Sequence, residues 1–129
     1  MGIGFRLAKS YQDHESIRVG AQWSYSGFNS FRQRLAADIG IDLTQMEGFG
    51  GEQRSWDTVN DPLKDLLNHS DCDGHLTAEQ CAVIGPRLKE LAEKWDENEG
   101  IMFHDKPNAL KLAVGMEAAA THKYLLMFC

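Results

Sequence analysis

Eight residues in the first part of the chain combine guanidinium groups, aromatic rings and a glycine-rich backbone. They are Trp23, Tyr25, Arg32, Arg34, Phe49, Gly50, Gly51 and Arg54. Arginines attract anions, consecutive glycine amides can surround one, and aromatic rings can stack on a planar group. This set therefore predicts a pocket for a small anion. The alternative is an ordinary aromatic core whose arginines pair with carboxylates.

Arg32 is the residue on which this prediction depends most. On a helix it would lie beside the apolar stripe of Phe28, Leu35 and Ile39, where its charge needs an anionic partner. We expect Arg32 near the loop at residues 48–51, beside a pocket walled by Trp23, Tyr25 or Phe49. A carboxylate such as Asp57 could satisfy Arg32 instead.

The stretch 69–77, His-Ser-Asp-Cys-Asp-Gly-His-Leu-Thr, could hold a metal ion. It resembles the calcium-binding loop of the EF-hand family, with Gly74 at the glycine position and Asp71 and Asp73 at the third and fifth ligand positions. The first position is His69 and the twelfth is Gln80, where that family has carboxylates. We therefore expect no tight calcium binding, and the loop is at most a degenerate EF-hand loop.

Two other interpretations of this loop remain open. A divalent transition metal could use His69, Asp71, Asp73 and His75, or the zinc-type ligands His69, Cys72, His75 and Cys81, although their spacing matches no usual zinc module. The loop could also be a tight turn that leads into a capped helix, with solvated histidines. No other cofactor is predicted, and the sequence contains no GxSxG, HExxH or CxxC motif.

The elements that would position these residues follow from apolar spacing and capping signals. We expect helices at 28–39, 62–68, 78–97 with a break near Pro86, and 108–120. Strands are expected at 3–8 and 124–128, with 9–21 mostly loop and Trp23 and Tyr25 on one strand face. The predicted fold is one α+β domain over residues 1–129, mainly α, with about four helices and a small sheet formed by the N- and C-terminal strands.

Glu117 is, with Lys111, one of two charged residues on the mainly apolar last predicted helix. If Glu117 is buried, we expect it to pair with a buried arginine such as Arg32 or Arg87, because an isolated buried charge is unfavourable. Without a partner it could act as a general acid or base.

Composition restricts the partners. The 129 residues carry 13 basic and 19 acidic side chains, a net charge of -6, which argues against a nucleic-acid polymer as partner. The whole excess of negative charge lies beyond residue 56, because residues 1–56 carry six charges of each sign. No apolar run suggests a membrane span, no secretion signal is evident, and the odd number of cysteines, three, favours reduced thiols in the cytoplasm.

The segments WSYSGF, FRQRLA, GFGG and NHSDCDGHLT together resemble a family of small uncharacterised bacterial and phage proteins, from about Trp23 to Trp95 and more loosely to Met116. The resemblance implies an intracellular protein without a known catalytic role, and it carries over no functional residues. In a phage, a natural use would be to sequester a host signalling nucleotide.

We therefore expect a non-enzymatic binding domain for a small anionic ligand, including nucleotide-like ones. The alternatives are a metal-dependent hydrolase that uses the 69–75 loop and a structural or protein-interaction domain. Assembly into a homo-oligomer stays open.

Overall fold

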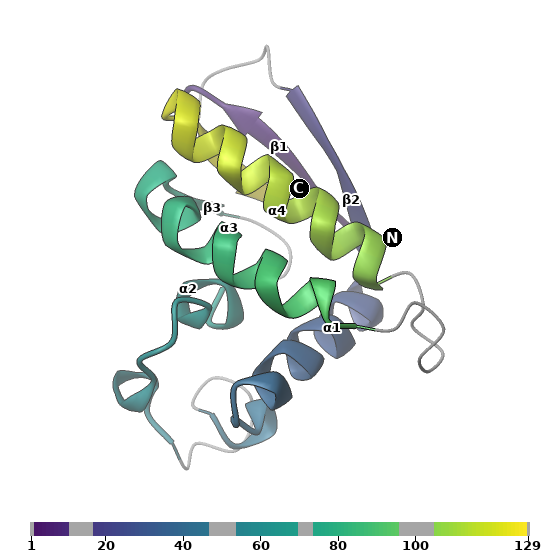
Figure 1. Ribbon diagram of the computed structural model, residues 1–129, viewed down its shortest axis with the longest axis vertical. Helices are drawn as coiled ribbons and strands as arrows, with labels where there is room; N and C mark the ends of the chain where they lie inside the picture. The colour runs from purple at the N-terminus through teal and green to yellow at the C-terminus, as the bar shows by residue number, and fades with distance from the viewer. Residues whose placement is uncertain (1, 11–16, 47–53, 70–73, 96–104, 129) are drawn as a thin grey trace.

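The computed structural model describes residues 2–10, 17–46, 54–69, 74–95 and 105–128. Four α-helices accompany an antiparallel sheet of four strands in the order β2-β1-β4-β3 (Figure 1). The strands are β1 (Gly2–Ala8), β2 (Ile17–Ser24), β3 (His75–Leu76) and β4 (Leu125–Phe128). The α-helices are α1 (Tyr25–Asp38), α2 (Lys64–Leu67), α3 (Ala78–Glu93) and α4 (Asp105–His122), with short 3-10 turns at Leu43–Gln45 and Trp56–Thr58. The predicted α+β, mainly α class is confirmed.

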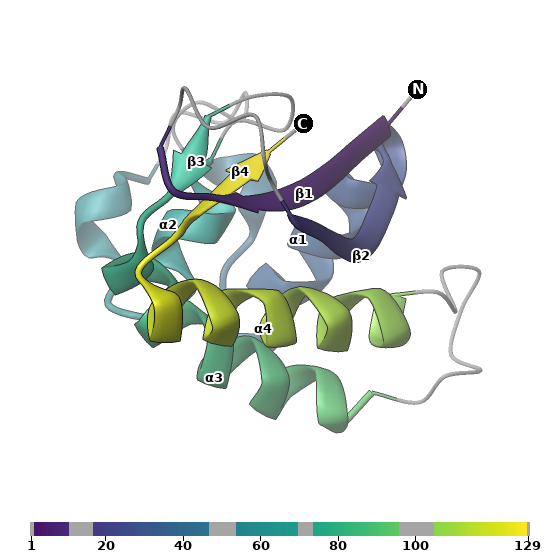
Figure 2. The same ribbon diagram turned by 90° about the horizontal axis from the view of Figure 1, so that it is seen from above.

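The two terminal strands lie side by side in the middle of the sheet. Phe5 of β1 is opposite Phe128 of β4, and Leu7 is opposite Leu126. These apolar side chains are buried, because alternate residues of a strand point to the same face and this face is covered by helices (Figure 2). The prediction that the C-terminal segment pairs with the N-terminal strand is therefore confirmed.

An aromatic cluster fills the space between the sheet and α1. The Trp23 ring stacks on Phe31 with 4.3 Å between centroids, and Phe5 meets Phe128 edge to face at 4.9 Å. Phe28 lies between these pairs and is fully buried. Burial of several aromatic rings supplies much of the hydrophobic stabilisation of a domain this small.

Helix α4 packs between the sheet and α3, and small residues make this possible. A Cβ built on Gly115 would lie 2.8 Å from both methyl groups of Val19 on β2. On the other helix, a Cβ on Gly85 of α3 would lie 3.2 Å from the Met116 side chain of α4. At Gly115 a side chain would force the helix or the strand to shift, whereas at Gly85 it would require Met116 to move by only a few tenths of an ångström.

The predicted break at Pro86 is wrong, because α3 runs without interruption from Ala78 to Glu93. Proline removes the hydrogen bond to the carbonyl four residues earlier, here that of Ala82. Both Pro86 and Ala82 are exposed, so water can bind this carbonyl. The helix begins with a capping box formed by Thr77 and Gln80.

Three other boundaries differ from the sequence prediction. The segment expected to be mostly loop, 9–21, contains the start of β2 at Ile17. Tyr25 does not share a strand face with Trp23, because Ser24 caps α1 and Tyr25 is its first residue. The last helix begins at Asp105, so Asn108 lies inside it and accepts a hydrogen bond from the backbone N–H of Gln22 at 3.3 Å.

Candidate functional site

Arg32 is buried, and its charged guanidinium binds backbone groups of the protein itself. Its side chain is 3% exposed, and its guanidinium donates to the backbone carbonyls of Leu67, at 3.3 Å, and His69. The guanidinium also lies over the Phe28 ring, 4.9 Å from the centroid. These contacts hold α1 against the segment that follows α2. The loop at 48–51, where we expected Arg32 to lie, is outside the described residues.

His69, the first residue of the predicted metal loop, makes its contacts within the protein. Its ring stacks on Phe128 at 3.9 Å, and its Nε2 is 2.9 Å from the carbonyl oxygen of His75. Gly74 has φ +88, which favours glycine, and its carbonyl accepts from the Phe128 N–H at 3.0 Å. In an EF-hand loop the first-position side chain and the seventh-position carbonyl bind the same ion. Here the corresponding groups, those of His69 and His75, contact each other.

The side chain at the twelfth position of the loop, Gln80, also makes its contacts within the protein. The Gln80 side chain accepts from the Thr77 N–H at 2.8 Å and donates to Asp65 at 3.1 Å. Asp71, Cys72 and Asp73 lie outside the described residues, so the metal predictions that involve them stay predictions. Within the described ranges no group of three or more His, Cys, Asp or Glu side chains is placed to hold a metal ion.

Trp23 and Arg34 meet at a buried carboxylate that sequence reasoning missed. Asp105, 1% exposed, accepts from the Trp23 indole N–H at 3.0 Å and lies 3.8 Å from an Arg34 nitrogen. The Arg34 guanidinium lies over the Trp95 ring at 4.1 Å, and the Trp95 indole N–H donates to Asp38 at 2.7 Å. These contacts join β2, α1, the end of α3 and the start of α4.

The remaining members of the predicted anion set do not join this cluster. Tyr25 is 38% exposed at the start of α1, and Arg54 is exposed with its Nε 3.0 Å from Thr58. Phe49, Gly50 and Gly51 lie outside the described residues. The structure thus divides the set: Arg32 contacts the loop of the metal prediction, while Trp23 and Arg34 share Asp105.

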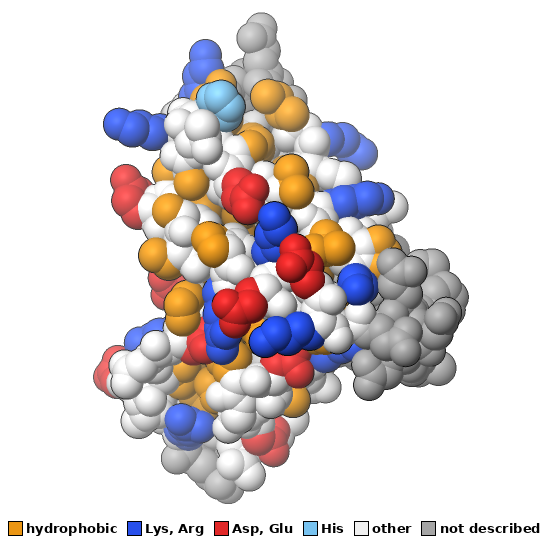
Figure 3. Space-filling model, in the orientation of Figure 1, with side chains coloured by type: hydrophobic (Ala, Val, Ile, Leu, Met, Phe, Trp, Pro, Cys, Tyr) orange, Lys and Arg blue, Asp and Glu red, His pale blue; other side chains and the backbone are white. Residues whose placement is uncertain are grey.

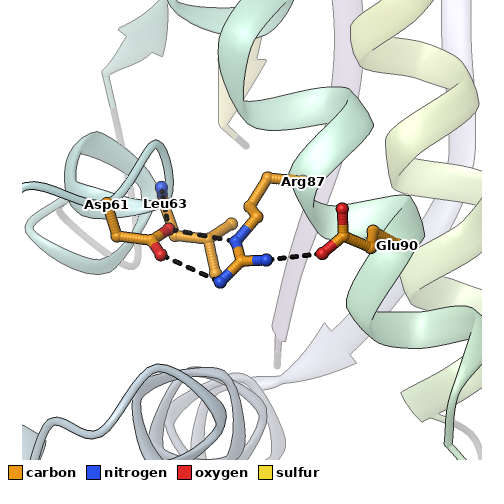
Figure 4. Close-up of polar contacts among 4 residues, drawn as sticks. All are labelled: Asp61, Leu63, Arg87 and Glu90. Carbon is orange, nitrogen blue, oxygen red and sulfur yellow. Dashed lines mark hydrogen bonds and ion pairs between the residues drawn. The ribbon is translucent and has the colours of Figure 1, made fainter.

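Glu117 is exposed, so the pairing with Arg32 or Arg87 that we expected for a buried Glu117 does not arise. Arg87 instead pairs with Asp61 at 3.1 Å and with Glu90 at 2.6 Å (Figure 4), and its hydrogen bond to Asp61 raises the pKa of Arg87 above its ordinary value. Glu117 lines an open groove between α3 and α4 in which charges of both signs alternate (Figure 3). The groove is lined by Pro86, Lys89, Glu90, Glu93, Lys94 and Glu117. Such a mixed surface favours neither an anion nor a cation.

The outer face of the sheet, the face turned away from the helices, carries basic groups. Arg6 of β1 lies directly opposite Arg18 of β2, and Met127 and His75 continue the same row across β4 and β3. Like charges that face each other across two strands are destabilising unless an anion lies between them. The other outer-face strand positions, which alternate with Phe5, Leu7 and Trp23, are Gly2, Gly4, Ala8, Gln22, Ser24 and Leu125. Ala8 and Met127 are buried although they lie on this face, so its exposed part is the β2 side, with Arg18 and Gln22. None of these strand residues is acidic.

Neither arginine of this row is neutralised within the described part of the chain. No ion pair joins Arg6 or Arg18 to a described carboxylate, and the Nε of Arg6 is buried without a hydrogen bond. The alternation of apolar and basic residues in Phe5-Arg6-Leu7 and Ile17-Arg18-Val19 is typical of two strands with arginines on one face. The sequence prediction missed this pair because it placed residues 17 and 18 in a loop.

Comparison with known proteins identifies no relative of this chain. No family model matches the chain, and neither the curated proteins nor the solved structures include a significant match. Among the described helices, none is both long and apolar enough to cross a membrane.

Proposed function

We propose that the chain is a non-enzymatic binding domain for a small anionic ligand, and that the ligand lies on the outer face of the sheet at Arg6 and Arg18. The observation that carries this proposal is the pairing of these two arginines directly opposite each other without a described counter-charge. The ligand class is the one expected from sequence, while the binding residues differ from those expected.

The chemistry of the pair favours a phosphate or carboxylate group. Each guanidinium presents several N–H donors in a plane, and two guanidinium groups together can bind the oxygens of one tetrahedral anion. The attraction of both arginines to an anion between them would outweigh their mutual repulsion. In a chain with net charge -6, a strand face with arginines and no carboxylate is the electrostatically favoured place for such a ligand.

The proposal includes a cytoplasmic location and a small ligand. A cytoplasmic location agrees with an odd number of cysteines, three, and a small ligand rather than a nucleic-acid polymer agrees with the net charge of -6.

The test measures binding of inorganic phosphate, pyrophosphate and nucleoside monophosphates by calorimetry, with Arg6→Gln and Arg18→Gln as variants and Arg54→Gln as the control. Arg54 is also an exposed arginine but lies away from the sheet. We expect each sheet variant to weaken binding at least tenfold and to leave the free protein as stable as before, because it relieves a repulsion.

Three results would contradict the proposal: no binding of any of these anions, binding that survives both sheet substitutions, or an equal loss in Arg54→Gln. Binding that depends on Arg34 but not on Arg6 or Arg18 would return the ligand to the residues expected from sequence.

A further inference from the structure

Beside the two arginines the outer face has an open patch of backbone. Gly4 lies two residues before Arg6 on β1, on the same face and about 7 Å away along the strand. A Cβ built on Gly4 would have no atom within 4 Å, so the space above this glycine is free. Gly4 has no positive φ that would require glycine there. Neither packing nor backbone geometry therefore explains the absence of a side chain.

Gln22 borders this patch from the neighbouring strand. It lies directly opposite Gly4, and its side chain is exposed. Its backbone N–H donates to Asn108, but no hydrogen bond to its carboxamide is found within the described residues. A carboxamide offers both a donor and an acceptor, which suits the polar edge of a heterocycle.

A strand irregularity separates the glycine patch from the arginines. The register changes between Gly4, opposite Gln22, and Phe5, opposite Val19, so β2 carries extra residues here. Such bulges bend and twist a strand and re-aim its side chains, and they are frequent beside binding sites.

We propose, on the basis of the function proposed above, that the ligand is a phosphorylated planar heterocycle of the nucleotide class. Its phosphate lies between Arg6 and Arg18, its ring lies flat on the backbone at Gly4, and Gln22 binds the polar edge of the ring. The distance of about 7 Å between Gly4 and Arg6 is comparable to the span of the sugar that joins base and phosphate. Any side chain at position 4 would fill the place of the ring.

The decisive variant is Gly4→Val, tested with nucleoside monophosphates of the four bases, ribose 5-phosphate and inorganic phosphate. Valine is favoured in strands and meets no neighbour here, so the free protein keeps its fold and its melting temperature or gains slightly. We expect nucleotide affinity to fall at least tenfold, to the level of ribose 5-phosphate, while the affinity for inorganic phosphate stays the same. Gly20→Ala is the matched control, because its new Cβ would make only an ordinary 3.6 Å contact with Lys111.

Gln22→Leu tests the ring edge separately. It should reduce the preference for one base over the others and leave phosphate binding unchanged.

The outcomes distinguish the two proposals. If nucleotides bind no better than ribose 5-phosphate to the unmodified protein, or if Gly4→Val leaves nucleotide affinity unchanged while Arg6→Gln abolishes it, the ring assignment is wrong and the anion site stands. If neither Arg6→Gln nor Arg18→Gln alters binding, both proposals fail.

Discussion

The Arg32 guanidinium on α1 donates to the backbone carbonyl of His69, 37 positions later in the chain. It also donates to the carbonyl of Leu67, so the end of α2 is fixed to α1 by a buried cation. Two residues that sequence analysis assigned to separate sites therefore belong to one structural unit.

Arg32→Met should destabilise the free protein. The variant keeps much of the apolar stem but leaves the carbonyls of Leu67 and His69 without their donor, and the loss of hydrogen bonds from a charged group lowers the free energy of unfolding by about 2–4 kcal/mol. Urea unfolding measures this change. Arg54→Met, at an exposed position, should alter stability by less than about 0.5 kcal/mol. An equally small effect of Arg32→Met would show that Arg32 does not hold the fold.

Asp105→Ala should have a large effect on the same measurement. It removes the acceptor of the buried Trp23 indole N–H and the carboxylate beside Arg34, a loss of about 3–5 kcal/mol. Asp105→Asn keeps a carbonyl oxygen for Trp23 and should lose less. Glu117→Gln, on the exposed face of the same helix, is the control and should be nearly neutral. Comparable losses at Glu117 and Asp105 would contradict the contact network.

Gly115→Ala tests the close approach of α4 to β2. The new Cβ would lie 2.8 Å from both Val19 methyl groups, so the helix or the strand must shift, at a loss of about 1–3 kcal/mol. Val19→Ala removes these methyl groups. The double variant should therefore be more stable than the sum of the two single changes predicts, whereas simple additivity in a double-mutant cycle would mean that the contact is absent.

Cys81 should make stability fall at alkaline pH. Burial raises the pKa of its thiol from 9.0 to about 12. Above pH 9 the thiol of the unfolded chain ionises while the native thiol stays protonated, so the free energy of unfolding decreases between about pH 9 and pH 12.

Thermal unfolding across this pH range, compared with Cys81→Ala, isolates the effect. The variant should lose less stability between pH 9 and pH 12, whatever its stability at neutral pH. Parallel pH profiles would mean that Cys81 is not buried in the native state. Under native conditions at pH 8 the peptide that contains Cys81 should also resist alkylation, because the thiolate is the reactive form.

Calcium should bind weakly or not at all to the 69–80 segment. The His69 ring contacts the His75 carbonyl, and the Gln80 side chain takes part in the helix cap, so groups at the first, seventh and twelfth positions are engaged within the protein. Calorimetry with calcium should show little heat. Submicromolar binding by the unmodified protein would refute this expectation.

A designed pair of substitutions gives the complementary test. Gln80→Glu keeps the capping box but replaces the hydrogen bond from Gln80 to Asp65 with two neighbouring carboxylates, and His69→Asp supplies a carboxylate at the first position. The double variant should bind calcium more tightly than the unmodified chain, provided that it remains folded by circular dichroism. Because His69→Asp also removes the ring that stacks on Phe128, stability without calcium should fall.

The sequence by itself determined the elements whose signals are local. The capping box of Thr77 and Gln80 fixed the start of α3, and apolar spacing located α1 and the two terminal strands. Such signals suffice because a helix cap or an apolar stripe depends on residues only a few positions apart. The interior Pro86 was misleading, since its effect on a helix depends on whether the freed carbonyl is exposed to water.

The tertiary structure decided which charged groups meet. Nothing in the local sequence indicates that Arg32 would contact the His69 carbonyl, or that Asp105 would accept from Trp23, because these partners are distant in the chain. Strand register likewise placed Arg6 opposite Arg18 and Gly4 opposite Gln22. A shift of β2 by one residue against β1 would have turned Arg18 and Gln22 to the other face. The fold class therefore followed from local pattern, whereas the candidate site followed from long-range pairing, which periodicity and residue type do not specify.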